Sequence, residues 1–171
     1  MKWILVVLTI SIFNCGYRTI QWQNTEYKNV FIQDIQTKPV FQRHVALFQN
    51  ALNDRCLAMS GLTITLEEDA DLILETKLHE VGETIIATDI DRRIRQVQFT
   101  VISSFRLVDK EGKVLWNLSN YRFSDQFEVS TTSGEYSNDA ASSYDSAFKN
   151  IAELVVTHFS ISISHLEEES D

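Results

Sequence analysis

A two-stranded pattern near the middle of the chain is its clearest structural signal. Between Val97 and Leu107 every second residue is apolar except Ser103, and mostly polar residues fill the intervening positions. This alternation predicts a long strand with one wet face. The run 109–113 supplies turn chemistry with a late glycine, and the alternation resumes over 114–118. The pattern therefore predicts a β-hairpin with an apolar face that needs a cover.

Two helical stripes are predicted to supply that cover. Apolar residues recur every three or four positions in two segments: Phe41, Val45, Phe48, Leu52, Cys56 and Met59 in the first, and Tyr144, Phe148, Ile151, Val155 and Phe159 in the second. This spacing places each set on one face of an amphipathic helix. Burying large side chains stabilises a fold by roughly 1.5–3 kcal/mol each, so we expect both stripes to pack against the sheet.

Shorter patterns complete the predicted sheet. Residues 30–35 and 72–81 have strand patterns, and 62–66 is either a strand or an extended lead-in. The segment 82–94 is predicted to be a loop, and 130–143 is a long polar loop by composition.

Two segments depart from simple periodicity. Trp116 and Leu118 are out of phase with Tyr121 and Phe123, which predicts a β-bulge near Ser119 or Asn120. Residues 160–165 alternate isoleucine with serine, a pattern that fits either a helix or a strand.

The order of elements is β-α-β-β-β-α, with no internal repeat and no linker. The expected fold class is α+β: a two-layer sandwich of a mostly antiparallel, four-stranded sheet with two helices on one face. We expect a single domain over 30–166, followed by a solvated acidic tail over 167–171.

The amino terminus has the pattern of an export signal. Residues 1–14 carry Lys2 followed by an apolar run that is too short for a stable membrane anchor, so we expect a signal peptide. Cys15 directly follows, as at a bacterial lipoprotein cleavage site, although Phe13 and Asn14 are larger than the residues usual there. Lipidation at Cys15 would make 15–29 a lipidated tether. The alternative is a secreted protein in which Cys15 is a plain thiol.

The second cysteine bears on the same choice. With Cys15 acylated, Cys56 has no partner for an intramolecular disulfide. A Cys15–Cys56 bridge is the competing interpretation.

Charge and motifs narrow the function classes. Loss of Lys2 leaves 14 basic and 24 acidic residues, a formal charge of −10, which argues against nucleic-acid binding. The run from His79 to Glu83 begins like a zinc-protease motif but lacks the second histidine and lies in a strand pattern. We therefore expect no catalytic residues, no metal site, no cofactor and no enzyme activity.

Several segments together resemble the lipopolysaccharide-assembly lipoproteins (LptE-like). These are Cys15-Gly16-Tyr17, 70–75, 95–101 and the Leu-Val-Asp…Gly-Lys-Val-Leu-Trp hairpin over 107–116. The resemblance implies a palmitate-bearing lipoprotein of a Gram-negative outer membrane, anchored on the periplasmic side. It also implies that the chain plugs the lipopolysaccharide-exporting β-barrel (LptD), helps that barrel fold, and contacts lipopolysaccharide. The alternative is a generic envelope adaptor or activator of a cell-wall enzyme or another envelope complex.

The family carries basic residues in the loop between its second and third strands. Here Arg92, Arg93 and Arg95 fall in that place, so the resemblance implies a contact with lipid phosphate. Guanidinium groups suit this role because they bind phosphate bidentately and stay charged. The alternative is that they solvate a loop and pair with Asp89 and Asp91.

Overall fold

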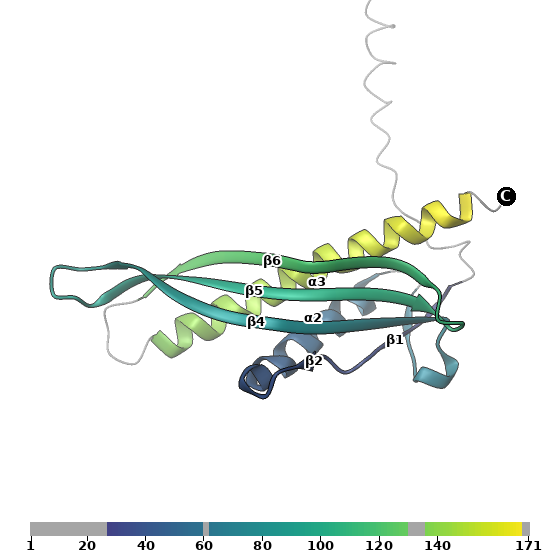
Figure 1. The fold of residues 1–171 in the computed structure, drawn as a ribbon, viewed down its shortest axis with the longest axis horizontal. Coiled ribbons are helices and arrows are strands. Elements are labelled where there is room, and N and C mark those ends of the chain that lie inside the picture. The colour runs from purple at the N-terminus through teal and green to yellow at the C-terminus, as the bar shows by residue number, and fades with distance from the viewer. Residues whose placement is uncertain (1–26, 60–61, 130–135, 169–171) are drawn as a thin grey trace, which may run out of the picture.

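Three long antiparallel strands run along the length of the molecule (Figure 1). The computed structural model describes residues 27–59, 62–129 and 136–168. The elements in chain order are β1 (Asn29–Ile32), β2 (Gln36–Thr37), η3 (Pro39–His44), α2 (Val45–Ala58), β3 (Thr63–Ile64), η4 (Glu67–Asp69), β4 (Leu72–Thr88), β5 (Ile94–Asp109), β6 (Val114–Glu128) and α3 (Tyr136–Glu168). The predicted α+β class is confirmed.

The sheet is larger than predicted and mixed. Its order is β3-β1-β4-β5-β6, and β2 also pairs with β4, which makes six strands rather than four. The strand β1 pairs in parallel with β3 and β4, and β2 pairs in parallel with β4. The prediction of a mostly antiparallel four-stranded sheet was therefore wrong. Of the two added strands, β3 lies within the run 62–66, for which a strand was one of the two alternatives, whereas β2 has only two residues, too few to show an alternation.

The strand β5 carries the core as predicted. All six inward positions are buried: Val97, Phe99, Val101, Ser103, Phe105 and Leu107. The ring of Phe105 meets Phe48 of α2 at 6.0 Å, and Phe99 meets Tyr144 of α3 at 5.3 Å between ring centroids. Both helices therefore cover the same face of the sheet.

The predicted bulge is present in β6. Ser103 pairs with Tyr121 and Phe105 pairs with Leu118, so two residues of β6 lie opposite Ser104. Asn120 adopts a left-handed φ of 52° and donates its backbone N–H to Ser104 Oγ at 2.9 Å. The extra residue returns the aromatic side chains of β6 to the helix-covered face.

The strand β4 extends further than predicted. It continues to Thr88, so the predicted loop 82–94 shrinks to a turn over 89–93. A register shift between Leu78 and Glu80 interrupts the alternation of apolar and polar residues. The sequence pattern therefore does not indicate that the strand continues. The β-branched residues after Glu83 suit that strand conformation.

The helix α3 also extends further than predicted at both ends. It begins at Tyr136, within the predicted polar loop 130–143, and 130–135 lie outside the described residues. It continues through 160–165, where Ser162 Oγ donates to His158 O at 3.0 Å and Ser160 Oγ donates to Val156 O. These bonds satisfy serine hydroxyls within the helix, and the helix also takes in the start of the predicted acidic tail.

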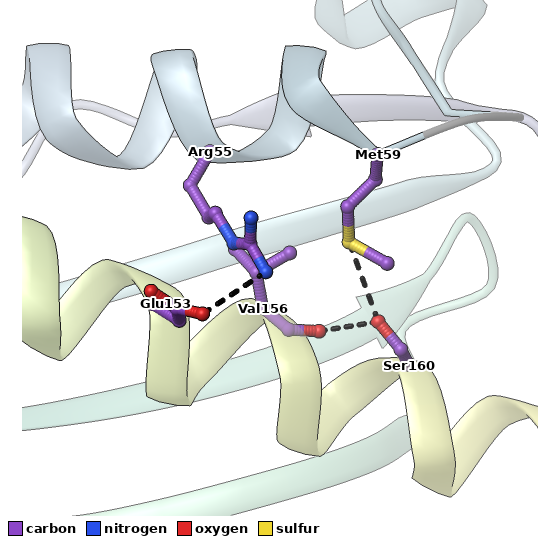
Figure 2. A network of polar contacts seen from close by, with 5 residues as sticks. All are labelled: Arg55, Met59, Glu153, Val156 and Ser160. Atoms are coloured by element: carbon purple, nitrogen blue, oxygen red, sulfur yellow. Dashed lines mark hydrogen bonds and ion pairs between the residues drawn. The ribbon is translucent and has the colours of Figure 1, made fainter. Parts of the chain in front are cut away.

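The two helices pack against each other as well as on the sheet. The rings of Phe48 and Phe148 stack at 4.7 Å. Figure 2 shows Arg55 of α2 paired with Glu153 of α3 at 3.4 Å, and Ser160 Oγ reaching Met59 Sδ at 3.5 Å. The exposed ion pair contributes little, so aromatic packing holds the helices together.

Candidate functional site: the β4–β5 hairpin tip

The predicted basic residues lie at the tip of a projecting hairpin. Figure 1 shows β4 and β5 extending past the start of α3 to one end of the molecule. We call residues 89–95 the hairpin tip. Asp89 N donates to Arg93 O at 2.9 Å and Arg92 N donates to Asp89 O at 3.0 Å, which closes the turn. Arg92 adopts a left-handed φ of 62°, a conformation that is costly for a side chain other than glycine.

Asp89 organises the hairpin tip. One carboxylate oxygen, Oδ1, accepts the backbone N–H groups of Asp91 at 2.9 Å and Arg93 at 2.8 Å. The other, Oδ2, pairs with the Arg95 guanidinium at 2.8 Å. The hydrogen bond from Arg93 N–H, aided by the charge of Arg95, lowers the pKa of Asp89 below its ordinary value. This carboxylate therefore holds the turn together in its charged form.

The three arginines have different surroundings. Arg95 is half-buried and paired with Asp89, so its guanidinium fixes the base of the turn. Arg92 and Arg93 are exposed, and neither forms an ion pair with any residue that the structure describes. The expected pairing with aspartate thus occurs at Arg95 alone. The other two guanidinium groups face solvent.

Exposed isoleucines accompany the arginines, and sequence reasoning missed them. Ile90 at the turn is 99% exposed, and Ile85 and Ile86 are 54% and 44% exposed. Single exposed apolar residues are ordinary on a protein surface, but three isoleucines within six residues concentrate apolar surface near the tip. The signal was the pair Ile85-Ile86 followed by Ile90, inside a segment that was predicted to be a loop. The tip therefore combines free positive charge with apolar surface.

The rejected zinc motif lies in a strand, as expected. The first and last residues of the motif bond to different partners. His79 Nε2 hydrogen-bonds Ser104 Oγ at 2.7 Å, and Glu83 Oε1 accepts the Tyr144 hydroxyl at 2.7 Å. Among the described residues, no group of three histidine, cysteine or acidic side chains is placed to hold a metal ion.

The two cysteines are in different situations. Cys56 is a free, fully buried thiol, and burial raises its pKa to about 12, so it is inert as a nucleophile. Cys15 and the predicted signal lie outside the described residues. Within the described ranges no helix is both long enough and apolar enough to span a membrane.

Solved structures of several bacterial proteins, two of them described as lipoproteins, share this fold of two helices on a mixed sheet. An uncharacterized lipoprotein B from Nitrosomonas europaea has a TM-score of 0.54 at 14% identity, covering 81% of this chain and 88% of that one. The rare lipoprotein B from Shewanella oneidensis has a TM-score of 0.53 at 7% identity, covering 82% and 99%. A protein from Xanthomonas campestris has a TM-score of 0.64 at 7% identity, covering 84% and 89%. These identities establish the shared fold alone.

The family follows from the sequence. The LptE family, described as lipopolysaccharide-assembly, matches residues 27–159, and the chain belongs to it. No curated protein sequence matches the chain. The predicted membership of a lipopolysaccharide-assembly family is thereby confirmed, and this membership supports an envelope-associated lipoprotein.

Proposed function

We propose that the protein is an outer-membrane lipoprotein that occupies the interior of the exporter barrel LptD and contacts lipopolysaccharide through the hairpin tip. Acylated Cys15 anchors it on the periplasmic side, and Arg92 and Arg93 bind the phosphates of the lipid. Arg95 holds the tip in shape from its pair with Asp89. The observation that carries the proposal is the pair of exposed guanidinium groups at the end of a projecting hairpin.

The length of the sheet supports this geometry. The chain enters the described body at β1, where Asp71 N donates to Asn29 O at 2.9 Å beside the start of β4. The strand β4 then runs for 17 residues to the tip. At about 3.3 Å per residue, roughly 55 Å separate the tether end from Arg92 and Arg93. The positive groups of the tip therefore lie at the opposite end of β4 from the residue at which the chain enters the described body.

Charge supports a phosphate ligand at the tip. The chain carries a formal net charge of −9, so an anion finds few attractive places on it. Arg92 and Arg93 are two adjacent cations without a carboxylate partner in the described chain. Two guanidinium groups bind phosphate oxygens through charge-assisted hydrogen bonds, and nearby Ile90 adds apolar contact.

The uncovered face of the sheet supports insertion into a barrel. Both helices pack on the Phe99 side, and the opposite side of β5 and β6 is largely polar, with Gln98, Arg106 and Arg122 exposed. Lumens of outer-membrane barrels are polar as well. A polar sheet face of this kind is suited to a wet, polar wall.

A charge-reversal experiment tests the lipid contact. The double variant Arg92→Glu with Arg93→Glu should weaken lipopolysaccharide binding by roughly tenfold or more, because two favourable charge contacts become repulsive. The matched control is Lys110→Glu with Lys113→Glu, which makes the same change of charge at exposed positions in the β5–β6 turn. Equal binding by both double variants would remove the tip from the proposal.

A second experiment tests the barrel and the anchor. We expect the protein to co-purify from membranes with LptD, and mass spectrometry of the mature amino terminus to find an acylated Cys15. Co-purification with a cell-wall enzyme in place of LptD would instead favour the adaptor role. An unmodified Cys15 would remove the lipid anchor.

A further inference from the structure

A recess of about 380 Å³ opens at the base of the projecting hairpin, away from the tip. Three parts of the fold meet there: the η3–α2 junction, β4 and the start of α3. Its apolar wall consists of Leu47, Ala140 and Ala141. The two alanines leave space because a larger side chain at either position would extend into the recess. Leu47 is 38% exposed.

The polar groups around this recess bond to one another. Tyr144 donates its hydroxyl to Glu83 Oε1 at 2.7 Å. Arg43 Nε donates to His44 Nε2 at 3.0 Å, and the imidazole ring lies 4.7 Å from the Tyr144 ring. Burial lowers the pKa of His44, so the ring stays neutral and accepts that bond. With its polar groups engaged in this way, the recess offers chiefly an apolar surface.

The strand β4 connects the recess to the hairpin tip, because Glu83 lines the recess and the strand ends at Thr88. Glu83 and Ile85 point to the same side of the strand, since Glu83 pairs with Phe99 and Ile85 with Val97. Ile85 is 54% exposed and lies between the recess and the turn. Thr88 is five positions beyond Glu83, which corresponds to roughly 16 Å along the strand.

We propose that the recess holds a hydrocarbon tail of the same lipid whose phosphates contact Arg92 and Arg93. This inference rests on the proposed function, because the head group sets the position from which the tail reaches the recess. An anionic amphiphile matches both the tip and the recess: its charged head meets two free guanidinium groups, and its tail passes Ile85 to the apolar wall. The tail enters because hydrocarbon leaves water there.

The test separates head from tail with two probes. Dodecyl phosphate carries both parts, and dodecyl maltoside carries the same tail with a neutral head. Binding is measured by calorimetry below the micelle concentration, on the mature chain with Cys15→Ser. The variant Ala141→Trp fills the recess and should weaken both probes by roughly tenfold or more, because even two lost methylene contacts have that effect.

Two further variants keep the result interpretable. Ser142→Trp adds the same bulk at the neighbouring exposed position, outside the recess lining, and should bind both probes like the parent. Leu47→Glu places a charge in the apolar wall and should weaken both probes, whereas Leu57→Glu, at an exposed leucine away from the recess, should not. Circular dichroism confirms that each variant is folded.

The tail site and the proposed function can fail separately. Parent-like binding of dodecyl maltoside by both Ala141→Trp and Leu47→Glu would overturn the tail site, whatever the tip does. Charge reversal of Arg92 and Arg93 should weaken dodecyl phosphate alone. If that double variant left both lipopolysaccharide and dodecyl phosphate unaffected, the head-group contact, and with it the proposed path, would be overturned.

Discussion

The strand β5 has a turn at each end, and the two turns share one hydrogen-bond pattern. At the tip Asp89 Oδ1 accepts from residues 91 and 93, at 2.9 and 2.8 Å. At the other end Asp109 Oδ1 accepts from residues 111 and 113, both at 2.9 Å. In each turn the fourth residue donates its N–H to the first carbonyl at 3.0 Å and adopts a positive φ.

The residue in that fourth position differs. Gly112 adopts φ 83° in the β5–β6 turn, where the lack of a Cβ makes the conformation easy. Arg92 adopts φ 62° in the same place at the tip and carries a long cationic side chain there. An arginine in a glycine position costs stability, and such strain is typical of residues kept for function. Arg92 therefore differs from Arg93 and Arg95 because its backbone is held in a strained conformation.

Both turns are held in place by the strand β5, which packs against the two helices. The largest predicted effect is a loss of stability when this packing is disrupted. Phe99 is 1% exposed and lies against Tyr144 and Phe127. The change Phe99→Asp should cost about 4 kcal/mol or more and unfold the protein, because it buries an unpaired charge and leaves a cavity. Urea titration followed by circular dichroism measures the loss.

The control for this change is the next residue. Gln98 is exposed on the opposite face of β5, so Gln98→Asp should stay within about 0.5 kcal/mol of the parent. If Phe99→Asp melted within a few degrees of the parent, the described packing of β5 against the helices would be wrong.

The second prediction exchanges the residues that distinguish the turns. Arg92→Gly should stabilise the tip by about 0.5–1 kcal/mol, because it relieves a left-handed conformation. Gly112→Ala should destabilise the other turn by about 1 kcal/mol, because alanine is strained in the left-handed conformation. No heavy atom lies within 4 Å of a Cβ at this position, so a steric clash would not add to that effect. Denaturant midpoints and hydrogen exchange at the two turns report both effects.

The same Arg92→Gly variant connects the strain to function. It should bind lipopolysaccharide more weakly than the parent while its tip exchanges more slowly. Arg92→Lys keeps both the charge and the strain and should retain most of the binding. Unchanged lipopolysaccharide binding by Arg92→Gly would mean that the strained arginine has no part in the contact.

The extent to which the sequence predicts this fold differs between the two turns. The run 109–113 was predicted as a turn because Gly112 marks its left-handed position. The run 89–93 was placed only within a longer loop, since Arg92 gives no such signal. The arginines themselves were found through the family resemblance, and their separation into paired Arg95 and unpaired Arg92 and Arg93 required the structure.

The length of a periodic segment decides how well the sequence predicts the other elements. The stripe from Phe48 to Cys56 and the alternation in β5 are long, so their burial followed from the sequence. The strand β2 has only two residues and forms through pairing with β4, which is far away in sequence. The recess depends on Ala140 and Ala141, small residues that have no distinctive pattern. Pairing and empty space are tertiary properties, so local periodicity does not reveal them.

The smallest predicted effect concerns the charge of Asp89. Its pKa is lowered in the folded tip, first by the Arg93 N–H, so the folded state favours the ionised form. The resulting stabilisation is complete above the unfolded pKa of about 4 and is lost as the pH falls through the lower, folded value. Amide NMR shifts of Asp91 and Arg93 should therefore titrate together at a midpoint below about pH 4. Asp89→Asn should abolish that shared titration. A midpoint at or above the unfolded value would show that the carboxylate does not hold the turn, and the likeness to the Asp109 turn would then end at the backbone.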